Sequence, residues 1–182
     1  MDVDIFDPTS KMTIRNNAQV GMFLAGVASV QTNGTLFIEN NNSVGLLLQA
    51  GSEFHNVPPA STTVSGNRST GISANQNSTL ALFGGSLTVS GNQGAGISIF
   101  ESSVLKANAG SLLVENNTGT NADGIYLSRS SNASLQALSG STLSVKIQNN
   151  GAGGITMYQQ SSGRFDVTTE MGQSGFLKEI VR

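Results

Sequence analysis

The sequence contains no cysteine, no tryptophan and only three prolines, and charged residues make up just 11% of it. The lack of cysteine excludes a disulfide framework and a thiolate metal site, and the single histidine, His55, excludes a zinc site built from several histidines. No apolar run reaches the roughly 18 residues that a membrane-spanning segment needs. A net charge of −2 provides no basic surface for phosphate groups. We therefore expect no cofactor, no metal, no nucleic-acid partner and no membrane insertion.

Turn-forming and strand-forming residues dominate what is present. Glycine occurs 22 times among 182 residues, and serine, threonine and asparagine are abundant. This composition is typical of β-strands joined by many turns rather than of helices. The length suits one domain with a sizeable core.

An internal repeat organises nearly the whole chain. An asparagine is followed four residues later by a glycine in five places, and a sixth copy has three extra residues between the two. These pairs are Asn17 and Gly21, Asn41 and Gly45, Asn67 and Gly71, Asn92 and Gly96, Asn117 and Gly124, and Asn150 and Gly154. Successive glycines are 24, 26, 25, 28 and 30 residues apart. A fixed period of this length indicates a repeat architecture.

Apolar residues have a strand-like period within each repeat. A β-branched aliphatic residue lies three positions before every repeat asparagine: Ile14, Ile38, Val64, Val89, Val114 and Ile147. The triplet after each glycine alternates with period two, as in residues 22–24 and 97–99. A third segment alternates more weakly, with Leu80 and Leu82 in one repeat and Val104 and Ala107 in the next. Each repeat is thus predicted to form three short strands.

A unit of three short strands cannot bury its own apolar face, but stacked units bury it continuously. The sequence therefore predicts an all-β solenoid of about six coils, with equivalent strands pairing in parallel at about 4.8 Å. The β-branched residues should stack inside it. We attribute the asparagine column to two needs at once: a positive φ at a tight corner, and side-chain hydrogen bonds that form a ladder from coil to coil.

The motifs VSGNQGAGISIFESS and VENNTGTNADGIYLSRSS resemble the right-handed parallel β-helix repeat of pectate-lyase-like enzymes, phage tailspikes and bacterial surface proteins. The resemblance covers residues 12–167 and implies the right-handed coil. It leaves residues 1–11 as an N-terminal cap and residues 168–182 as a C-terminal cap or a continuation. The fold is compatible with many functions, including lyases, hydrolases, adhesins and inert stalks.

The charged residues give little support to catalysis. Glu39 and Glu115 occupy equivalent places three coils apart, about 14 Å, which is too far for a hydrolytic pair. Arg15 lies one coil before Glu39, so we expect a surface ion pair there. Asp123, in the longest corner, forms the best local mix of charges with Arg129 and Lys106. Asparagine- and glycine-rich corners nevertheless favour aspartate as a turn former.

A binding face is the more promising candidate. The second and fourth residues after each glycine should point outward, and four of the ten aromatic residues occupy such positions: Phe23, Phe100, Tyr126 and Tyr158. Aromatic rings flanked by hydroxyl and amide groups suit the stacking and hydrogen bonding of sugars. The predicted ligand-binding set is these four residues with Asp123 and Arg129. Single exposed apolar residues are also common on ordinary protein surfaces.

We interpret the chain as a non-enzymatic structural or adhesive module of an exported or surface bacterial protein. Its expected partners are a polysaccharide or cell-surface glycan, further domains, or other copies joined end to end. The alternative is a polysaccharide lyase or hydrolase, or the substrate-binding part of one. The first residues lack the pattern of a secretory signal, so an extracellular location would require another export route or a processed chain. His55 is expected in a solvated loop between the second and third coils.

Overall fold

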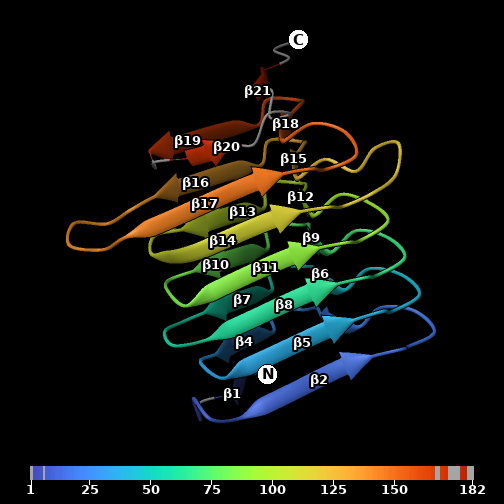
Figure 1. The fold of residues 1–182 in the computed structure, drawn as a ribbon, viewed down its shortest axis with the longest axis vertical. Coiled ribbons are helices and arrows are strands. Elements are labelled where there is room, and N and C mark those ends of the chain that lie inside the picture. The colour runs from blue at the N-terminus through green and yellow to red at the C-terminus, as the bar shows by residue number, and fades with distance from the viewer. Residues whose placement is uncertain (1, 6, 167–168, 172–176, 180–182) are drawn as a thin grey trace.

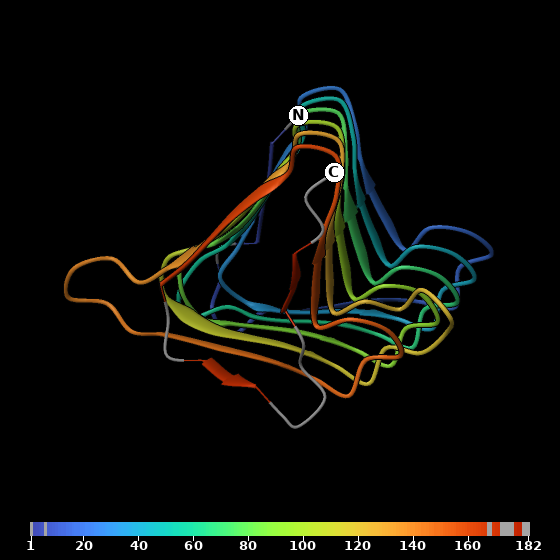
Figure 2. The same cartoon turned by 90° about the horizontal axis from the view of Figure 1, so that it is seen from above.

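The computed structural model describes the backbone of residues 2–5, 7–166, 169–171 and 177–179, and the side chains of residues 7–166. These residues form a parallel β-solenoid of about six turns with three strands in each turn, and no helix occurs among them. Seen along its axis, the solenoid has a triangular outline whose sides are three sheets (Figures 1 and 2). The predicted fold class is confirmed.

Each sheet has seven parallel strands. Sheet A contains β1 (Asp2–Ile5), β4 (Ser29–Thr32), β7 (Glu53–Asn56), β10 (Thr79–Leu82), β13 (Val104–Ala107), β16 (Asn132–Gln136) and β19 (Ser162–Asp166). Sheet B contains β2 (Lys11–Arg15), β5 (Thr35–Glu39), β8 (Ser61–Ser65), β11 (Ser86–Ser90), β14 (Gly110–Glu115), β17 (Leu143–Gln148) and β20 (Thr169–Met171). Sheet C contains β3 (Met22–Leu24), β6 (Leu46–Leu48), β9 (Ile72–Ala74), β12 (Ile97–Ile99), β15 (Ile125–Leu127), β18 (Ile155–Met157) and β21 (Leu177–Glu179). We number the coils 1 to 6 from β2–β3–β4 to β17–β18–β19.

The strand registers place equivalent residues of each repeat side by side. The six β-branched residues pair in sequence through sheet B: Ile14, Ile38, Val64, Val89, Val114 and Ile147. All are buried except the half-buried Ile14 of coil 1. The six strands of sheet C in coils 1 to 6 begin one residue after the repeat glycines, as predicted. In sheet A one prediction was wrong: Leu105, not Val104, is buried with Ala107, because Leu105 pairs with the inward Leu80.

The asparagine ladder is confirmed from coil 1 to coil 6. Each Nδ2 donates to the Oδ1 of the next asparagine over 2.8–2.9 Å, from Asn17 to Asn150. The backbone amide of each asparagine donates to the same Oδ1. The positive φ that we assigned to these asparagines was wrong. The positive φ belongs to the preceding residue of each repeat: Asn16, Asn40, Gly66, Gly91, Asn116 and Asn149.

The repeat glycines are required by space rather than by backbone conformation. A Cβ on Gly96 would lie 2.7 Å from the carbonyl oxygen of Gly124 and 2.8 Å from Nδ2 of Asn117. Gly45 and Gly71 face equivalent groups of their following coils. Asparagine and glycine therefore recur together, because the glycine leaves room for the ladder of the next coil.

Both predicted end segments contain strands. β1 lies within residues 1–11 and pairs with β4, while β20 and β21 lie within residues 168–182 and pair with β17 and β18. Whether these segments act as caps stays a prediction, since their side chains fall outside the described residues apart from residues 7–11. No helix in the described part of the chain is long and apolar enough to cross a membrane.

Candidate functional site

After each of the six strands of sheet C in coils 1 to 6, the chain turns into sheet A through two consecutive residues with positive φ. These pairs are Gly26 and Val27, Ala50 and Gly51, Gln76 and Asn77, Glu101 and Ser102, Arg129 and Ser130, and Gln159 and Gln160. The amide of the second residue donates to the carbonyl of the first residue in the next coil, as from Asn77 to Glu101 over 3.0 Å. Left-handed backbone is unfavourable for most residues. Here it is stabilised by the same bond in coils 1 to 5.

A serine follows five of these six pairs. Ser52, Ser78, Ser103, Ser131 and Ser161 share this position, and coil 1 has Ala28. Ser52, Ser78 and Ser131 each donate a hydroxyl hydrogen bond to the carbonyl three residues before. The amide of Ser78 also donates to Oγ of Ser103 over 3.0 Å. We call this turn the serine corner, and the opposite turn, before sheet C, the ladder corner.

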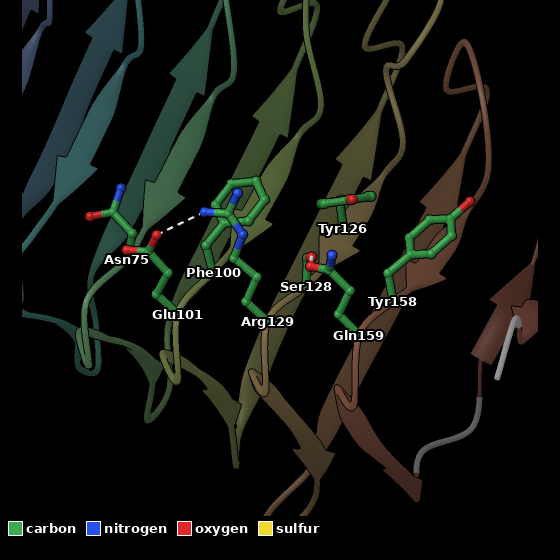
Figure 3. A pocket seen from close by; sticks show the side chains of 8 residues that line it. All are labelled: Asn75, Phe100, Glu101, Tyr126, Ser128, Arg129, Tyr158 and Gln159. Carbon is green, nitrogen blue, oxygen red and sulfur yellow. Dashed lines mark hydrogen bonds and ion pairs between the residues drawn. The ribbon is translucent and has the colours of Figure 1, made fainter. Parts of the chain in front are cut away.

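Three aromatic residues lie side by side over sheet C in coils 4 to 6. The ring of Tyr126, from β15, is 5.5 Å from that of Phe100 and 5.8 Å from that of Tyr158, measured between centroids. Phe100 and Tyr158 come directly after β12 and β18, respectively. Such distances are typical of tilted aromatic pairs. We call Phe100, Tyr126 and Tyr158 the aromatic row (Figure 3).

A groove of about 470 Å³ runs between the aromatic row and the serine corner. Besides the row it is lined by Asn75, Glu101, Ser128, Arg129 and Gln159. Nη1 of Arg129 lies 2.8 Å from Oε1 of Glu101, and the hydroxyl of Ser128 donates to Oε1 of Gln159 over 2.8 Å. Oδ1 of Asn75 is buried without a hydrogen-bond partner. We call this the polar groove.

A second groove, of about 780 Å³, shares the aromatic row. Its remaining lining comes from sheet C and the ladder corner: Thr70, Gly94, Ala95, Ser98, Asn121, Asp123, Ala152, Gly153 and Thr156. Because strands of sheet C run from the ladder corner to the serine corner, the row separates this groove from the polar groove. The aromatic side chains are therefore accessible from both flanks.

Asp123 has a clear structural environment in the second groove. Its side chain is buried, with the residue 8% exposed, and Oδ1 accepts hydrogen bonds from the amide of Gly153 at 2.8 Å and the hydroxyl of Thr156 at 2.7 Å. These bonds attach the long corner of coil 5 to coil 6. They support the interpretation of Asp123 as a turn residue that also lines the groove.

The structure brings together five of the six predicted ligand-binding residues. Phe100, Tyr126 and Tyr158 line both grooves, Arg129 lines the first and Asp123 the second. Phe23 is separate: it lies in coil 1, three coils from Phe100 or about 14 Å at strand spacing, and is 56% exposed. Ligand binding by any of these residues stays a prediction.

The other charged residues that we considered lie apart from the aromatic row. Lys106 is on sheet A, with Nζ 5.7 Å from the ring centroid of Phe83, and so does not join Asp123. Arg15 pairs with Glu39 in the strand register, but no salt bridge joins them among the described residues. Glu115 accepts a hydrogen bond from Gln148 over 2.6 Å.

The expectation of a loop position for His55 was wrong. His55 lies in β7, with Nε2 3.2 Å from Oε2 of Glu53 and its ring against that of Phe83. In the part of the chain that the structure describes, no group of three or more histidine, aspartate or glutamate side chains is placed to hold a metal ion.

The sequence interpretation missed the serine corner and, with it, the pairing of Glu101 with Arg129 and the contribution of Gln159. A signal was present: each of the five serines comes exactly seven residues after a repeat glycine. The left-handed pairs gave no such signal, because glutamine, glutamate and arginine do not favour positive φ.

Comparisons with protein-family models, with curated proteins and with solved structures each found no match.

Proposed function

We propose that this chain is a non-enzymatic structural or adhesive β-solenoid module that binds glycans along its aromatic row. The observation that carries the proposal is the juxtaposition of Phe100, Tyr126 and Tyr158 from three successive coils. Its setting would be an exported or cell-surface protein of the pectate-lyase-like or bacterial surface class, attached to further domains or to other copies end to end.

The chemistry of the row suits sugars. A pyranose ring has apolar faces formed by C–H groups and a rim of hydroxyls, so it stacks on an aromatic face while its rim makes hydrogen bonds. The polar groove supplies amide and hydroxyl groups next to the rings, from Asn75, Ser128 and Gln159. An isolated exposed aromatic residue would not provide this combination.

Hydrolysis receives less support from the same surface. A glycosidase needs two carboxyl groups on either side of the scissile bond, one of them protonated. In the described grooves the carboxylate of Glu101 is paired with Arg129, and that of Asp123 is held by Gly153 and Thr156. Among the described lining residues, neither carboxylate faces a second carboxylate across its groove. This arrangement favours glycan binding over glycan cleavage.

The test is a glycan array probed with the natural chain and with Tyr126→Ala, which removes the central ring of the row. We expect the natural chain to bind and the variant to lose about tenfold in affinity, equivalent to about 1.4 kcal/mol. Phe37→Ala is the matched control, since Phe37 is a half-buried aromatic of sheet B under Lys11. The control should bind normally. Lack of binding to every glycan would refute the proposal, and release of sugar products would favour the alternative lyase or hydrolase.

A further inference from the structure

We propose that the polar groove takes an uncharged polysaccharide, with its chain lying along the solenoid axis across coils 4 to 6. This inference rests on the proposed glycan-binding function and adds the direction and the charge class of the ligand.

The direction follows from how the coils stack. The three rings come from successive coils, so the aromatic row runs parallel to the axis, perpendicular to the strands of sheet C (Figure 3). The groove extends from Asn75 in coil 3 to Gln159 in coil 6. Three strand spacings make this about 14 Å. A chain of several sugars along the axis crosses the strands and contacts all three rings, whereas a chain lying along one strand contacts one ring.

The charge class follows from the ion pair in the groove wall. Among the residues whose side chains the structure describes, Glu101 and Arg129 are the only charged ones that line the polar groove, and they lie 2.8 Å apart. Their charges cancel, so the described lining of the groove offers no free cation to an acidic sugar. A ligand carboxylate would also approach Glu101, and like charges brought together at a site act against binding.

The other described cations do not line the polar groove. They lie on sheet A, on sheet B or at the ladder corner: Lys106 over Phe83, Arg164 in β19 with Nη2 3.8 Å from Oδ2 of Asp166, Lys11 and Arg15 in β2, Lys146 in β17, and Arg68 in a different pocket. The remaining groups of the groove are neutral. The buried Oδ1 of Asn75 has no protein partner, so this amide is free to rotate toward a hydroxyl without breaking an existing bond. Neutral hydroxyls also cost less to desolvate than carboxylates.

The experiment compares two classes of polymer by affinity gel electrophoresis at low and high salt. Xylan, glucomannan and laminarin represent uncharged chains, while polygalacturonate and alginate represent acidic ones. The variants are Glu101→Gln, which frees the charge of Arg129, and Arg129→Gln, which breaks the same ion pair but leaves the negative charge. Tyr126→Ala is included in each series.

We expect the natural chain to retard in at least one uncharged polymer, independently of salt, and not in the acidic ones. Glu101→Gln should gain affinity for the acidic polymers by roughly tenfold at low salt and lose the gain at high salt, because exposed charges are screened. Arg129→Gln should show no such gain at either salt concentration.

Three outcomes would overturn the inference. Tighter binding of the natural chain to acidic polymers, still reduced by Tyr126→Ala, would refute the uncharged ligand while leaving glycan binding intact. Failure of Glu101→Gln to gain acidic binding would show that the ion pair does not select the charge class. Binding to no polymer would refute glycan binding itself and the inference with it.

Discussion

The two corners that flank sheet C both contain residues with left-handed backbone. Side-chain hydrogen bonds link the coils at one corner, and backbone hydrogen bonds link them at the other. At the ladder corner one residue has positive φ, and the asparagine beside it links the coils through buried side-chain bonds. At the serine corner two residues have positive φ, and backbone bonds link the coils. The difference determines which side chains remain free to vary.

Where side chains hold the coils together, the residue type is fixed. All six coils have asparagine in the ladder, and in coils 1 to 5 the repeat glycine leaves room for the asparagine of the next coil. Where the backbone holds them together, the side chain is not needed for the fold. The first residue of the serine corner is accordingly glycine, alanine, glutamine, glutamate, arginine and glutamine from coil 1 to coil 6. This free position is the one that supplies Glu101, Arg129 and Gln159 to the polar groove.

The largest effect should come from breaking the ladder in its middle with Asn92→Ala. The substitution removes four hydrogen bonds: those from the amide and Nδ2 of Asn67 to Oδ1 of Asn92, and those from Nδ2 of Asn92 to Oδ1 of Asn117 and the carbonyl of Val64. Each hydrogen bond contributes about 1 kcal/mol, so we expect a loss of about 4 kcal/mol in the free energy of unfolding. Urea unfolding followed by circular dichroism measures it.

Asn17→Ala is the matched control for the ladder. Asn17 begins the ladder, is exposed, and contributes one side-chain bond, to Asn41. Its replacement should cost about 1 kcal/mol, because water can satisfy the groups left behind. Equal losses from the two substitutions would contradict the view that burial makes the ladder stabilising.

The sequence allowed the ladder corner to be predicted and left the serine corner unseen, for a physical reason. Asparagine and glycine are required by local sterics and by one specific hydrogen bond, so their spacing carries the repeat. The left-handed conformation of Glu101 or Arg129 is imposed by bonds to the neighbouring coil, and such strain persists only where the surroundings determine it. The pairing of these two residues depends on register, which no short motif contains.

An intermediate loss of stability should come from Ser103→Ala at the serine corner. Oγ of Ser103 accepts the hydrogen bond of the Ser78 amide, and Ser78 is buried, so the substitution leaves one buried donor unpaired. We expect a loss of about 1–2 kcal/mol in the free energy of unfolding. Ser102→Ala, at the exposed neighbouring residue, should change stability by less than about 0.5 kcal/mol. A loss as large as that of Asn92→Ala would mean that side chains, and not the backbone, hold this corner.

The smallest effect on stability should be a gain rather than a loss. Val27 is a β-branched residue with a φ of 59°, and its 75% exposure shows that it contributes little to the core. Asn77 occupies the equivalent position in coil 3 with a φ of 63° and is also exposed. Asparagine tolerates this conformation better than valine. Val27→Asn should therefore stabilise the protein by about 1 kcal/mol, and the reciprocal Asn77→Val should destabilise it by a similar amount, both read from urea midpoints. If neither substitution moves the midpoint, the backbone bonds between coils determine the conformation so fully that local preference no longer matters, and the free position beside them tolerates any side chain.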